Sequence, residues 1–258
     1  MFKGFFAALG FLTIIPPPGA MGADAAAFRR APGYFPLVGI MEGAFFALLG
    51  LAALRTVGPY AAAGFILAAR AIITGGLHLD GLSDTFDSLA ARGTAKGDRL
   101  QAMKGGPAGP AGVAAVALTL IIKFALLSRA LSASRGPLPA LAAVFFMPVA
   151  ARWGMVMNIL HGHPAKKDGL GAMVSANTDL AGAVRATIFA AIPVLLWIFY
   201  LKGGGFLPVS FTAVYAFSIA SDVFCRKRFG GITGDTIGAT SELSEMIFLI
   251  PAACIGYF

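Results

Sequence analysis

The sequence has little charge and little cysteine. Only 12% of its 258 residues are charged, against roughly 25% in soluble domains, whereas 58% are hydrophobic and the mean hydropathy is +0.81. So few charges exclude a water-soluble globular domain. The two cysteines, Cys225 and Cys254, are too few for a disulfide framework or a thiolate metal cage. The composition therefore indicates an integral membrane protein and leaves the redox compartment undetermined.

Long apolar segments predict helices that cross a bilayer. About 20 apolar residues cross a hydrocarbon layer of ~30 Å, whereas a spanning barrel would show alternating segments of about ten residues. We predict an all-α, polytopic transmembrane bundle that forms one integral-membrane domain over residues 1–258. About seven spans are expected, with five to eight as the open range, and they cover residues 35–54, 58–77, 111–131, 138–160, 183–202, 206–224 and 241–258.

The apolar run from Phe5 to Ile15 differs from these spans. It is too short to cross the membrane, and three prolines at 16–18 follow it. We expect a short interfacial or re-entrant helix here. A signal peptide is the alternative, because Lys3 precedes the run and small residues follow it, but the prolines and the poor cleavage context argue against it.

The basic residues are distributed unevenly between the loops. If segment 78–110 is cytoplasmic, alternation of the spans places thirteen Lys and Arg residues on that side and four on the other. This bias supports seven spans, with the C-terminus outside and the long polar loops facing the cytoplasm. The pI near 9.8 fits lipid headgroups or phosphorylated substrates better than nucleic acid, because no continuous basic face is present.

Acidic residues are also scarce, and six of the twelve lie in two short segments. In the first segment, Asp80, Asp84 and Asp87 would fall within about 60° of one another on a helix. Neighbouring carboxylates repel unless protons or a cation intervene, and oxygen ligands suit a hard divalent ion, above all Mg²⁺. We therefore predict that these three residues are catalytic and bind magnesium. A solvated loop face is the alternative.

The second acidic segment runs from 230 to 245. On helical spacing one stripe contains Gly231, Gly234, Asp235, Gly238, Glu242 and Glu245. Small residues let a partner backbone approach closely, so we expect this stripe to pack against the first segment at the cytoplasmic edge. Asp235, Glu242 and Glu245 would then join the metal site. Helix-packing glycines, caps and surface charges are the alternative interpretations.

Two further titratable residues have competing interpretations. We predict that His78 is catalytic and ligates metal, donates to phosphate or acts as a base, with a lone interfacial histidine as the alternative. Glu42 lies deep in the first predicted span, where a lipid-facing carboxylate is costly. We expect it to pair with Arg70 or Arg152 as a structural contact.

Basic residues near the acidic segments supply the complementary charge. A metal ion and guanidinium groups together neutralise a diphosphate and its departing charge. The bases that we predict to bind substrate on this ground are Arg92, Lys104, Arg152 and Lys167, together with Gly169 of the turn that follows Lys167. Each base taken alone is more often a determinant of membrane topology.

The acidic segments carry a resemblance to a known family. The runs GGLHLDGLSDTFD at 75–87 and GGITGDTIGATSELSE at 230–245 resemble the cobalamin synthase family, adenosylcobinamide-GDP ribazoletransferase. The resemblance extends along nearly the whole chain through FLTIIPPP at 11–18, YFPLVGIMEG at 34–43, ARWGMV at 151–156 and KKDGLGAMV at 166–174. One departure is Gly105, where family members usually have an acid. The glycine-rich backbone at 105–109 could still approach a phosphate through its amides.

The resemblance implies a multi-pass inner-membrane enzyme that requires Mg²⁺. Such an enzyme joins α-ribazole, or its 5′-phosphate, to adenosylcobinamide-GDP and releases GMP. The family motifs fall on His78, Asp80, Gly81, Asp84, Asp87, Thr233, Gly234, Asp235, Glu242 and Glu245. Among these we assign Thr233 and Gly234 to substrate binding. The expected partners are the two substrates and the lipid bilayer, with no nucleic acid, and a homo-oligomer is left open.

Two other functions compete with this interpretation. A CDP-alcohol phosphotransferase of phospholipid synthesis also uses clustered aspartates, but its motif needs Ala-Arg soon after Asp-Gly, and here Ala91-Arg92 comes too late after Asp80-Gly81. A polytopic cation or metabolite transporter would place its acids near the midplane and often shows inverted repeats. Here the acids lie at predicted helix ends, and no repeat is evident.

Overall fold

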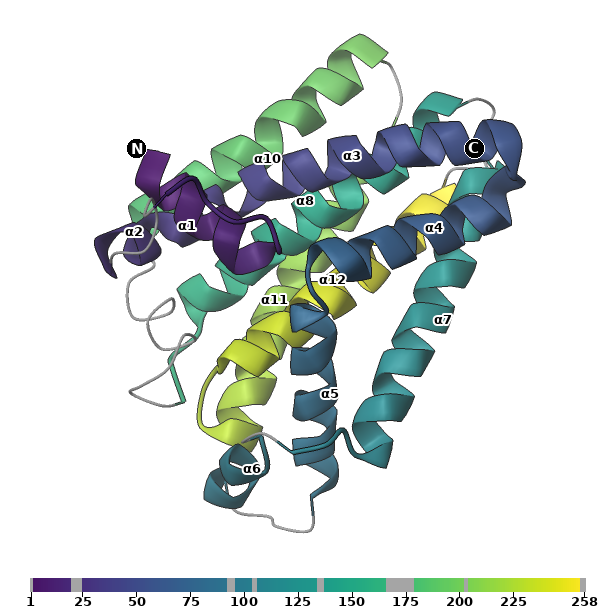
Figure 1. Cartoon of the computed structure of the whole chain (residues 1–258). Helices are drawn as coiled ribbons and strands as arrows, with labels where there is room; N and C mark the ends of the chain where they lie inside the picture. Colours follow the sequence, from purple (N-terminus) through teal and green to yellow (C-terminus); the bar gives the residue numbers. More distant parts are fainter. Residues whose placement is uncertain are drawn as a thin grey trace.

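A computed structural model of the chain describes residues 2–19, 25–91, 96–103, 106–133, 137–165, 179–201 and 204–255. All regular elements in these ranges are helices, which confirms the predicted all-α fold (Figure 1). Six of the described helices are long and apolar enough to cross a membrane, or seven if one bent pair counts as a span. The chain is therefore a multi-pass membrane protein.

The long helices lie close to the predicted spans. They are α3 (Phe35–Thr56), α4 (Gly58–Ile73), α7 (Pro110–Ala133), α8 (Pro137–His161), α10 (Leu180–Leu201), α11 (Leu207–Phe229) and α12 (Gly234–Ile255). Prolines stand in the first turns of several of them, where the missing N–H has no helical partner to lose. The shorter elements are α1 (Phe2–Leu12), α2 (Ala25–Arg30), the 3₁₀ helix η1 (Ala31–Tyr34), α5 (Leu77–Ala90) and α6 (Lys96–Ala102).

Helices α8 and α12 form the centre of the bundle (Figure 1). The most apolar stretch of α8 is 83% buried and that of α12 is 67% buried, whereas that of α10 is only 11% buried. Glycines allow the central helices to pack closely. A Cβ added to Gly39 of α3 would lie 2.9 Å from the Cα of Val149 of α8. Close backbone contact of this kind is the usual way in which membrane helices associate.

Helix α12 begins seven residues earlier than the predicted span 241–258. The backbone N–H of Thr233 donates to the Thr236 hydroxyl (2.8 Å), and the Thr236 N–H donates to the Thr233 hydroxyl (3.2 Å). These reciprocal bonds satisfy amide groups that have no partner in the first turn. The second acidic segment is therefore helical from Gly234 onward, as its helical spacing suggested, and the predicted span 241–258 starts too late.

A sharp bend separates α4 from α5 and positions the first acidic segment. The two helix axes meet at 88°. Gly75 and Gly76 adopt positive φ values of 59° and 72°, which glycine populates readily and other residues avoid. The Gly76 N–H donates to the carbonyl of Ala71 (2.9 Å) and closes the end of α4. Helix α5 then runs between α7 and α12 (Figure 1), so the predicted span 58–77 ends early.

The predicted short N-terminal helix is present as α1. It packs against α2, η1 and α3 at the end of the molecule that lies far from the C-terminus (Figure 1). The segment that follows α1 reaches the bend, because the N–H of Ile14 donates to the carbonyl of Ile73 (2.8 Å). The N-terminal helix and the first acidic segment are thus directly connected.

Candidate active site

The two acidic segments pack against each other, as the sequence predicts. Gly81 of α5 faces the start of α12, and a Cβ added to it would lie 2.7 Å from the carbonyl oxygen of Asp235. Gly238 of α12 faces α5 in turn, and its Cβ would lie 3.4 Å from the Cα of His78. Two glycines thus remove the side chains that would separate these helices. The acidic residues beside them project from a shared edge.

Four aspartates form an aspartate cluster at this edge: Asp80, Asp84 and Asp87 of α5 and Asp235 of α12. Asp80 is exposed and the other three are half-buried. The negative charges of Asp80, Asp235 and Asp87 all act on Asp84. Among the ion pairs of the described residues, none involves Asp80 or Asp84. The cluster therefore attracts cations.

Asp87 has a positioning role inside this cluster. Its two carboxylate oxygens accept hydrogen bonds from the backbone N–H groups of Gly109 (2.7 Å) and Gly112 (2.8 Å). These amides belong to the start of α7, where the helix dipole favours a negative charge. Asp87 thus fastens α5 to α7. The Gly109 amide, which the sequence offered to a phosphate, is bound to Asp87 instead.

The cluster suits an open magnesium site rather than a closed one. Within the described ranges, no group of three or more His, Cys, Asp and Glu side chains is arranged to hold a metal ion by itself. Magnesium is commonly held by one or two carboxylates while substrate phosphates and water supply the other oxygens. The accessible carboxylates of Asp80 and Asp84, with Asp235 nearby, fit that partial donor set.

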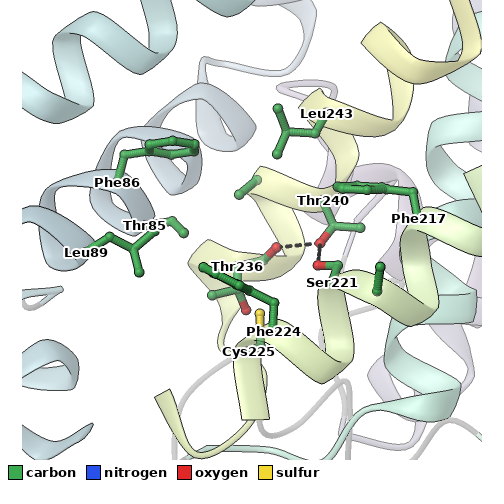
Figure 2. A pocket seen from close by; sticks show the side chains of 12 residues that line it. Thr85, Phe86, Leu89, Phe217, Ser221, Phe224, Cys225, Thr236, Thr240 and Leu243 are labelled. Atoms are coloured by element: carbon green, nitrogen blue, oxygen red, sulfur yellow. Dashed lines mark hydrogen bonds between the residues drawn. The ribbon is translucent and has the colours of Figure 1, made fainter. Parts of the chain in front are cut away.

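A cavity of about 400 Å³ lies between α5, α11 and α12 (Figure 2). Thr85 and Thr236 line it, and they directly follow Asp84 and Asp235 in the sequence. Most of the other lining side chains are apolar. On α5, however, the cavity residues lie on the helix face opposite to Asp80, Asp84 and Asp87, so the apolar recess and the acidic edge are separate features.

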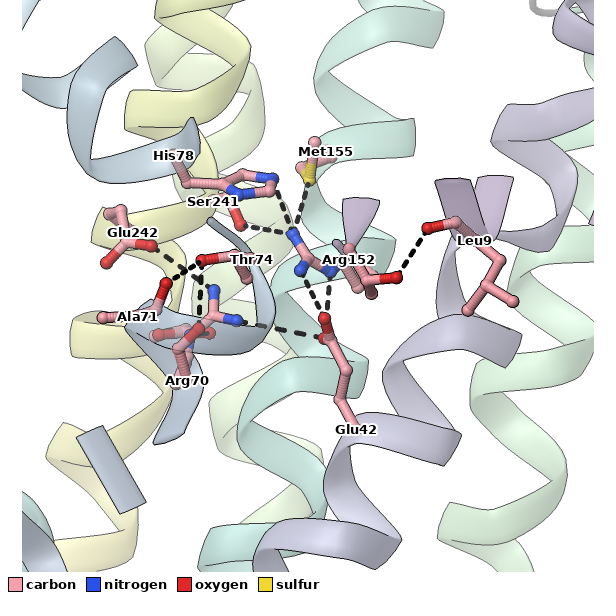
Figure 3. Close-up of polar contacts among 12 residues, drawn as sticks. Leu9, Glu42, Arg70, Ala71, Thr74, His78, Arg152, Met155, Ser241 and Glu242 are labelled. Carbon is pink, nitrogen blue, oxygen red and sulfur yellow. Dashed lines mark hydrogen bonds and ion pairs between the residues drawn. The ribbon is translucent and has the colours of Figure 1, made fainter. Parts of the chain in front are cut away.

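Arg152 of α8 is the centre of a second, fully buried group of charges (Figure 3). Its guanidinium donates to both carboxylate oxygens of Glu42 (2.7 and 3.2 Å) and to the Ser241 hydroxyl (3.4 Å). One of its nitrogens also lies 2.7 Å from Nε2 of His78. Glu42 therefore pairs with Arg152, which confirms the structural role expected for it. Arg70 also approaches Glu42, at 3.9 Å.

Glu242 and Glu245 extend this group toward α4 and α7. The Lys123 ammonium lies 2.6 Å from Glu242 and 2.7 Å from Glu245, and Arg70 pairs with both carboxylates. Three acids and three bases balance in what we call the buried charge network: Glu42, Arg70, Lys123, Arg152, Glu242 and Glu245. Both glutamates predicted as metal ligands thus have cationic partners already. Two turns beyond Asp235, the acidic stripe of α12 faces α4 and α7 instead of the accessible edge.

The other predicted site residues are divided between buried and accessible positions. His78 is 1% exposed and Arg152 0%, so neither contacts solvent in this structure. Thr233 is buried and directly precedes α12, whereas Gly234, the first residue of α12, is exposed. The remaining predicted substrate-binding residues, Arg92, Lys104, Lys167 and Gly169, lie outside the described residues.

Sequence reasoning missed two buried charges. Lys123 lies in the middle of the predicted span 111–131 and is 1% exposed. Asp222, also 1% exposed, pairs with Arg226 near the end of α11. A lone charge inside an apolar span is energetically costly unless it has a partner. The sequence could therefore have predicted that Lys123 and Asp222 each have a partner.

Comparison with known proteins gives a consistent result. The family model described as cobalamin-5-phosphate synthase matches residues 4–253. Among curated proteins named adenosylcobinamide-GDP ribazoletransferase, that of Geotalea daltonii is 33% identical over 99% of both chains. That of Clostridioides difficile is 31% identical over 96% of both, and that of Klebsiella pneumoniae strain 342 is 32% identical over 97% of this chain and 99% of its own. No solved structure matches the chain significantly.

Proposed function

The chain belongs to the cobalamin-5-phosphate synthase family, and from this premise we propose that it is an adenosylcobinamide-GDP ribazoletransferase. It joins α-ribazole, or its 5′-phosphate, to adenosylcobinamide-GDP and releases GMP. The observation that carries the proposal is the contact of the two acidic segments, because it assembles four aspartates at one edge. The relatives' shared name supports this function, and neither a phospholipid-forming phosphotransferase nor a transporter is among the relatives compared.

The reaction is a displacement at phosphorus. The ribose hydroxyl of the nucleoside attacks the phosphoryl group attached to cobinamide, a new P–O bond forms, and the P–O bond to GMP breaks. Asp80, Asp84 and Asp235 would hold Mg²⁺, with Asp87 fixing the orientation of α5. Magnesium, when bound, offsets the charge of the diphosphate and of the departing phosphate. A carboxylate of the cluster that does not bind the metal would take the hydroxyl proton.

We place the reaction at the cytoplasmic face of the inner membrane. The exposed bases Arg226, Lys227 and Arg228 end α11, directly before the start of α12 and Asp235. Basic residues favour the cytoplasmic side of a span. Soluble phosphorylated substrates are also available on that side.

The direct test uses the purified full chain in liposomes. It is incubated with adenosylcobinamide-GDP, α-ribazole and Mg²⁺, while GMP is measured by chromatography and the joined corrinoid by mass. We expect equal amounts of both products, and none after EDTA is added. Absence of GMP with a folded protein would contradict the proposed activity, and uptake of substrate without GMP formation would favour a transporter.

Replacing single aspartates tests the cluster. We expect Asp80→Asn and Asp84→Asn each to lower GMP release roughly 100-fold or more, because each removes a negative oxygen from the reacting edge. Both variants should also need more Mg²⁺ for half-maximal rate. Asp179→Asn is the control, since this exposed residue caps α10 through Gly182 and lies outside the cluster. Undiminished turnover in both Asp80→Asn and Asp84→Asn would refute the metal-site assignment.

A further inference from the structure

His78 is a buried histidine that the displacement described above does not use. We propose that it is a positioning residue for Asp80, an inference that rests on the proposed function. In this role it accepts a hydrogen bond from Arg152 and fixes the start of α5, and it neither binds the metal nor takes a proton. This role differs from the catalytic roles that the sequence suggested for His78.

The contact with Arg152 determines where the imidazole ring carries its hydrogen. Nε2 of His78 lies 2.7 Å from a guanidinium nitrogen of Arg152. A guanidinium has only donors, so Nε2 has to accept, and the ring is the neutral form with its hydrogen on Nδ1. A metal ligand or a general base needs a free lone pair. The lone pair of Nε2 is occupied and Nδ1 has none to offer, so neither nitrogen serves in those roles.

Burial also separates His78 from the substrates. The side chain is 1% exposed, so a phosphate group outside the bundle does not reach Nδ1 without displacing packed side chains. Within the part of the chain that the structure describes, Nδ1 has no hydrogen-bond partner. The orientation of the ring therefore depends on the contact between Nε2 and Arg152.

Arg152 is a firmly held anchor for this contact (Figure 3). Its guanidinium also donates to both carboxylate oxygens of Glu42 and to the Ser241 hydroxyl. Glu42 belongs to α3, Arg152 to α8 and Ser241 to α12, so three helices together define where the guanidinium lies. The planar guanidinium is pre-organised and loses little freedom for each further bond. His78 connects α5 to this anchor.

The anchored ring lies close enough to Asp80 to set the direction of its carboxylate. His78 is in the first turn of α5, and Asp80 follows two residues later. Successive helical residues are about 100° apart, so residues two apart face nearly opposite directions. His78 is accordingly buried while Asp80 is exposed. The flexible Gly75 and Gly76 directly precede this turn, so the contact with Arg152 supplies the rigidity that the glycines do not.

Two substitutions of His78 separate positioning from chemistry. In His78→Gln the side-chain carbonyl can accept from Arg152 as Nε2 does, but an amide takes up no proton. In His78→Leu the acceptor is lost at similar volume. We expect His78→Leu to lower kcat for GMP release roughly tenfold or more, because small displacements of reacting groups have such effects, and His78→Gln to stay within about threefold. His163→Leu and His163→Gln are the controls, because His163 is exposed.

Metal binding gives a measurement that needs no turnover. Mn²⁺ is the probe, because it prefers oxygen ligands as Mg²⁺ does, and its binding to the full chain is followed through the EPR signal of the free ion. We expect His78→Leu to bind Mn²⁺ several-fold more weakly, since Asp80 is displaced, and His78→Gln to bind it about as tightly as the natural chain. A purely structural role would lower only the unfolding temperature of His78→Leu, without changing its Mn²⁺ affinity or the kcat of the folded protein.

Several outcomes would overturn the assignment. Equal loss of kcat in folded His78→Leu and His78→Gln would show that the imidazole itself takes part in the reaction. A nitrogen coupling in the pulsed EPR spectrum of bound Mn²⁺ that disappears in His78→Gln would make His78 a ligand. Normal kcat and normal Mn²⁺ affinity in both variants would show that Asp80 does not depend on His78.

The two measurements also distinguish this role from the proposed activity. If the natural chain forms no GMP, the activity fails, whereas the Mn²⁺ affinities of the two variants still decide whether His78 positions Asp80. If GMP forms and His78→Leu is as active as the natural chain, the positioning role fails and the activity stands. Absence of both GMP formation and Mn²⁺ binding would overturn both.

Discussion

Arg152 shows how single residues sustain this bundle. A buried charge is tolerated only when partners surround it, and this guanidinium contacts Glu42, His78 and Ser241 on three different helices. His78 begins α5, so the same contacts hold the first turn of that helix against α8 and α12. One buried side chain therefore connects the core of the bundle to the start of the acidic edge.

Removing Arg152 should leave Glu42 without its main partner. We expect Arg152→Met to lower the free energy of unfolding by about 3–5 kcal/mol, the usual effect of breaking a buried ion pair from one side. The measurement is thermal unfolding of the purified chain in detergent. Lys227→Met is the control, because Lys227 is exposed at the end of α11.

The double variant Arg152→Met with Glu42→Gln isolates the reason for this loss. Its stability should be partly restored, because the uncompensated carboxylate is gone. Equal instability of the single and double variants would show that the charge of Glu42 is not what destabilises the chain.

At the level of residues the sequence predicted some contacts and not others. A basic partner for Glu42, either Arg70 or Arg152, followed from the cost of a carboxylate inside a span, and the structure shows Arg152 as the main one. The partners of Glu242 and Glu245 did not follow, because helical spacing tells which residues share a face and not which helix packs against it. The chain has twenty Lys and Arg residues, of which the topology prediction assigns thirteen to the cytoplasmic side and four to the other side. The remaining three are Arg70, Lys123 and Arg152, and all three lie in the buried charge network.

Among the elements, the bend between α4 and α5 has the largest effect on the site. A straight continuation of α4 would carry Asp80 and Asp84 away from Asp235, whereas the turn of 88° brings α5 alongside the start of α12. The conformations of Gly75 and Gly76 make this turn inexpensive. The geometry of the candidate site therefore depends on a feature outside the aspartates themselves.

A matched pair of glycine variants tests the bend. Gly76 has φ 72° and Gly58, at the other end of α4, has φ 82°, and an added Cβ meets nothing within 4 Å at either position. Gly76→Ala and Gly58→Ala should each lose about 1–2 kcal/mol of stability from the left-handed conformation alone. Only Gly76→Ala should reduce GMP release at a temperature where both are folded. Equal activity of the two variants would separate the bend from catalysis.

The extent of the helices was more predictable than their ends near the site. Hydropathy located α3, α7, α8, α10 and α11 to within a few residues, because long apolar runs have few alternatives in a bilayer. It failed at α12, since the polar residues from Gly234 to Glu242 lower the hydropathy of a helix whose charges are paired inside the bundle. Hydropathy also missed the early end of α4. A pair of glycines permits a turn, but the sequence alone does not show that the turn forms.

For the whole molecule, the distribution of charge predicts orientation in the membrane. Arg228 and Gly205 are exposed at opposite ends of α11. In a Cys254→Ser background, we expect Arg228→Cys to react with an impermeant maleimide only from the cytoplasmic side and Gly205→Cys only from the outer side. Labelling from the two sides is measured in right-side-out and in inverted vesicles. Cys225 is buried and should stay unlabelled. Reversed labelling would contradict the positive-inside assignment.

The short length of α4 has a consequence for the surrounding lipid. Its 16 residues rise only about 24 Å, less than the ~30 Å of hydrocarbon that a full crossing requires. A helix of this length spans only a thinner hydrocarbon layer, so a thicker bilayer has to deform locally around α4. We therefore expect the acyl-chain length of the host membrane to affect how easily a soluble nucleotide reaches the candidate site.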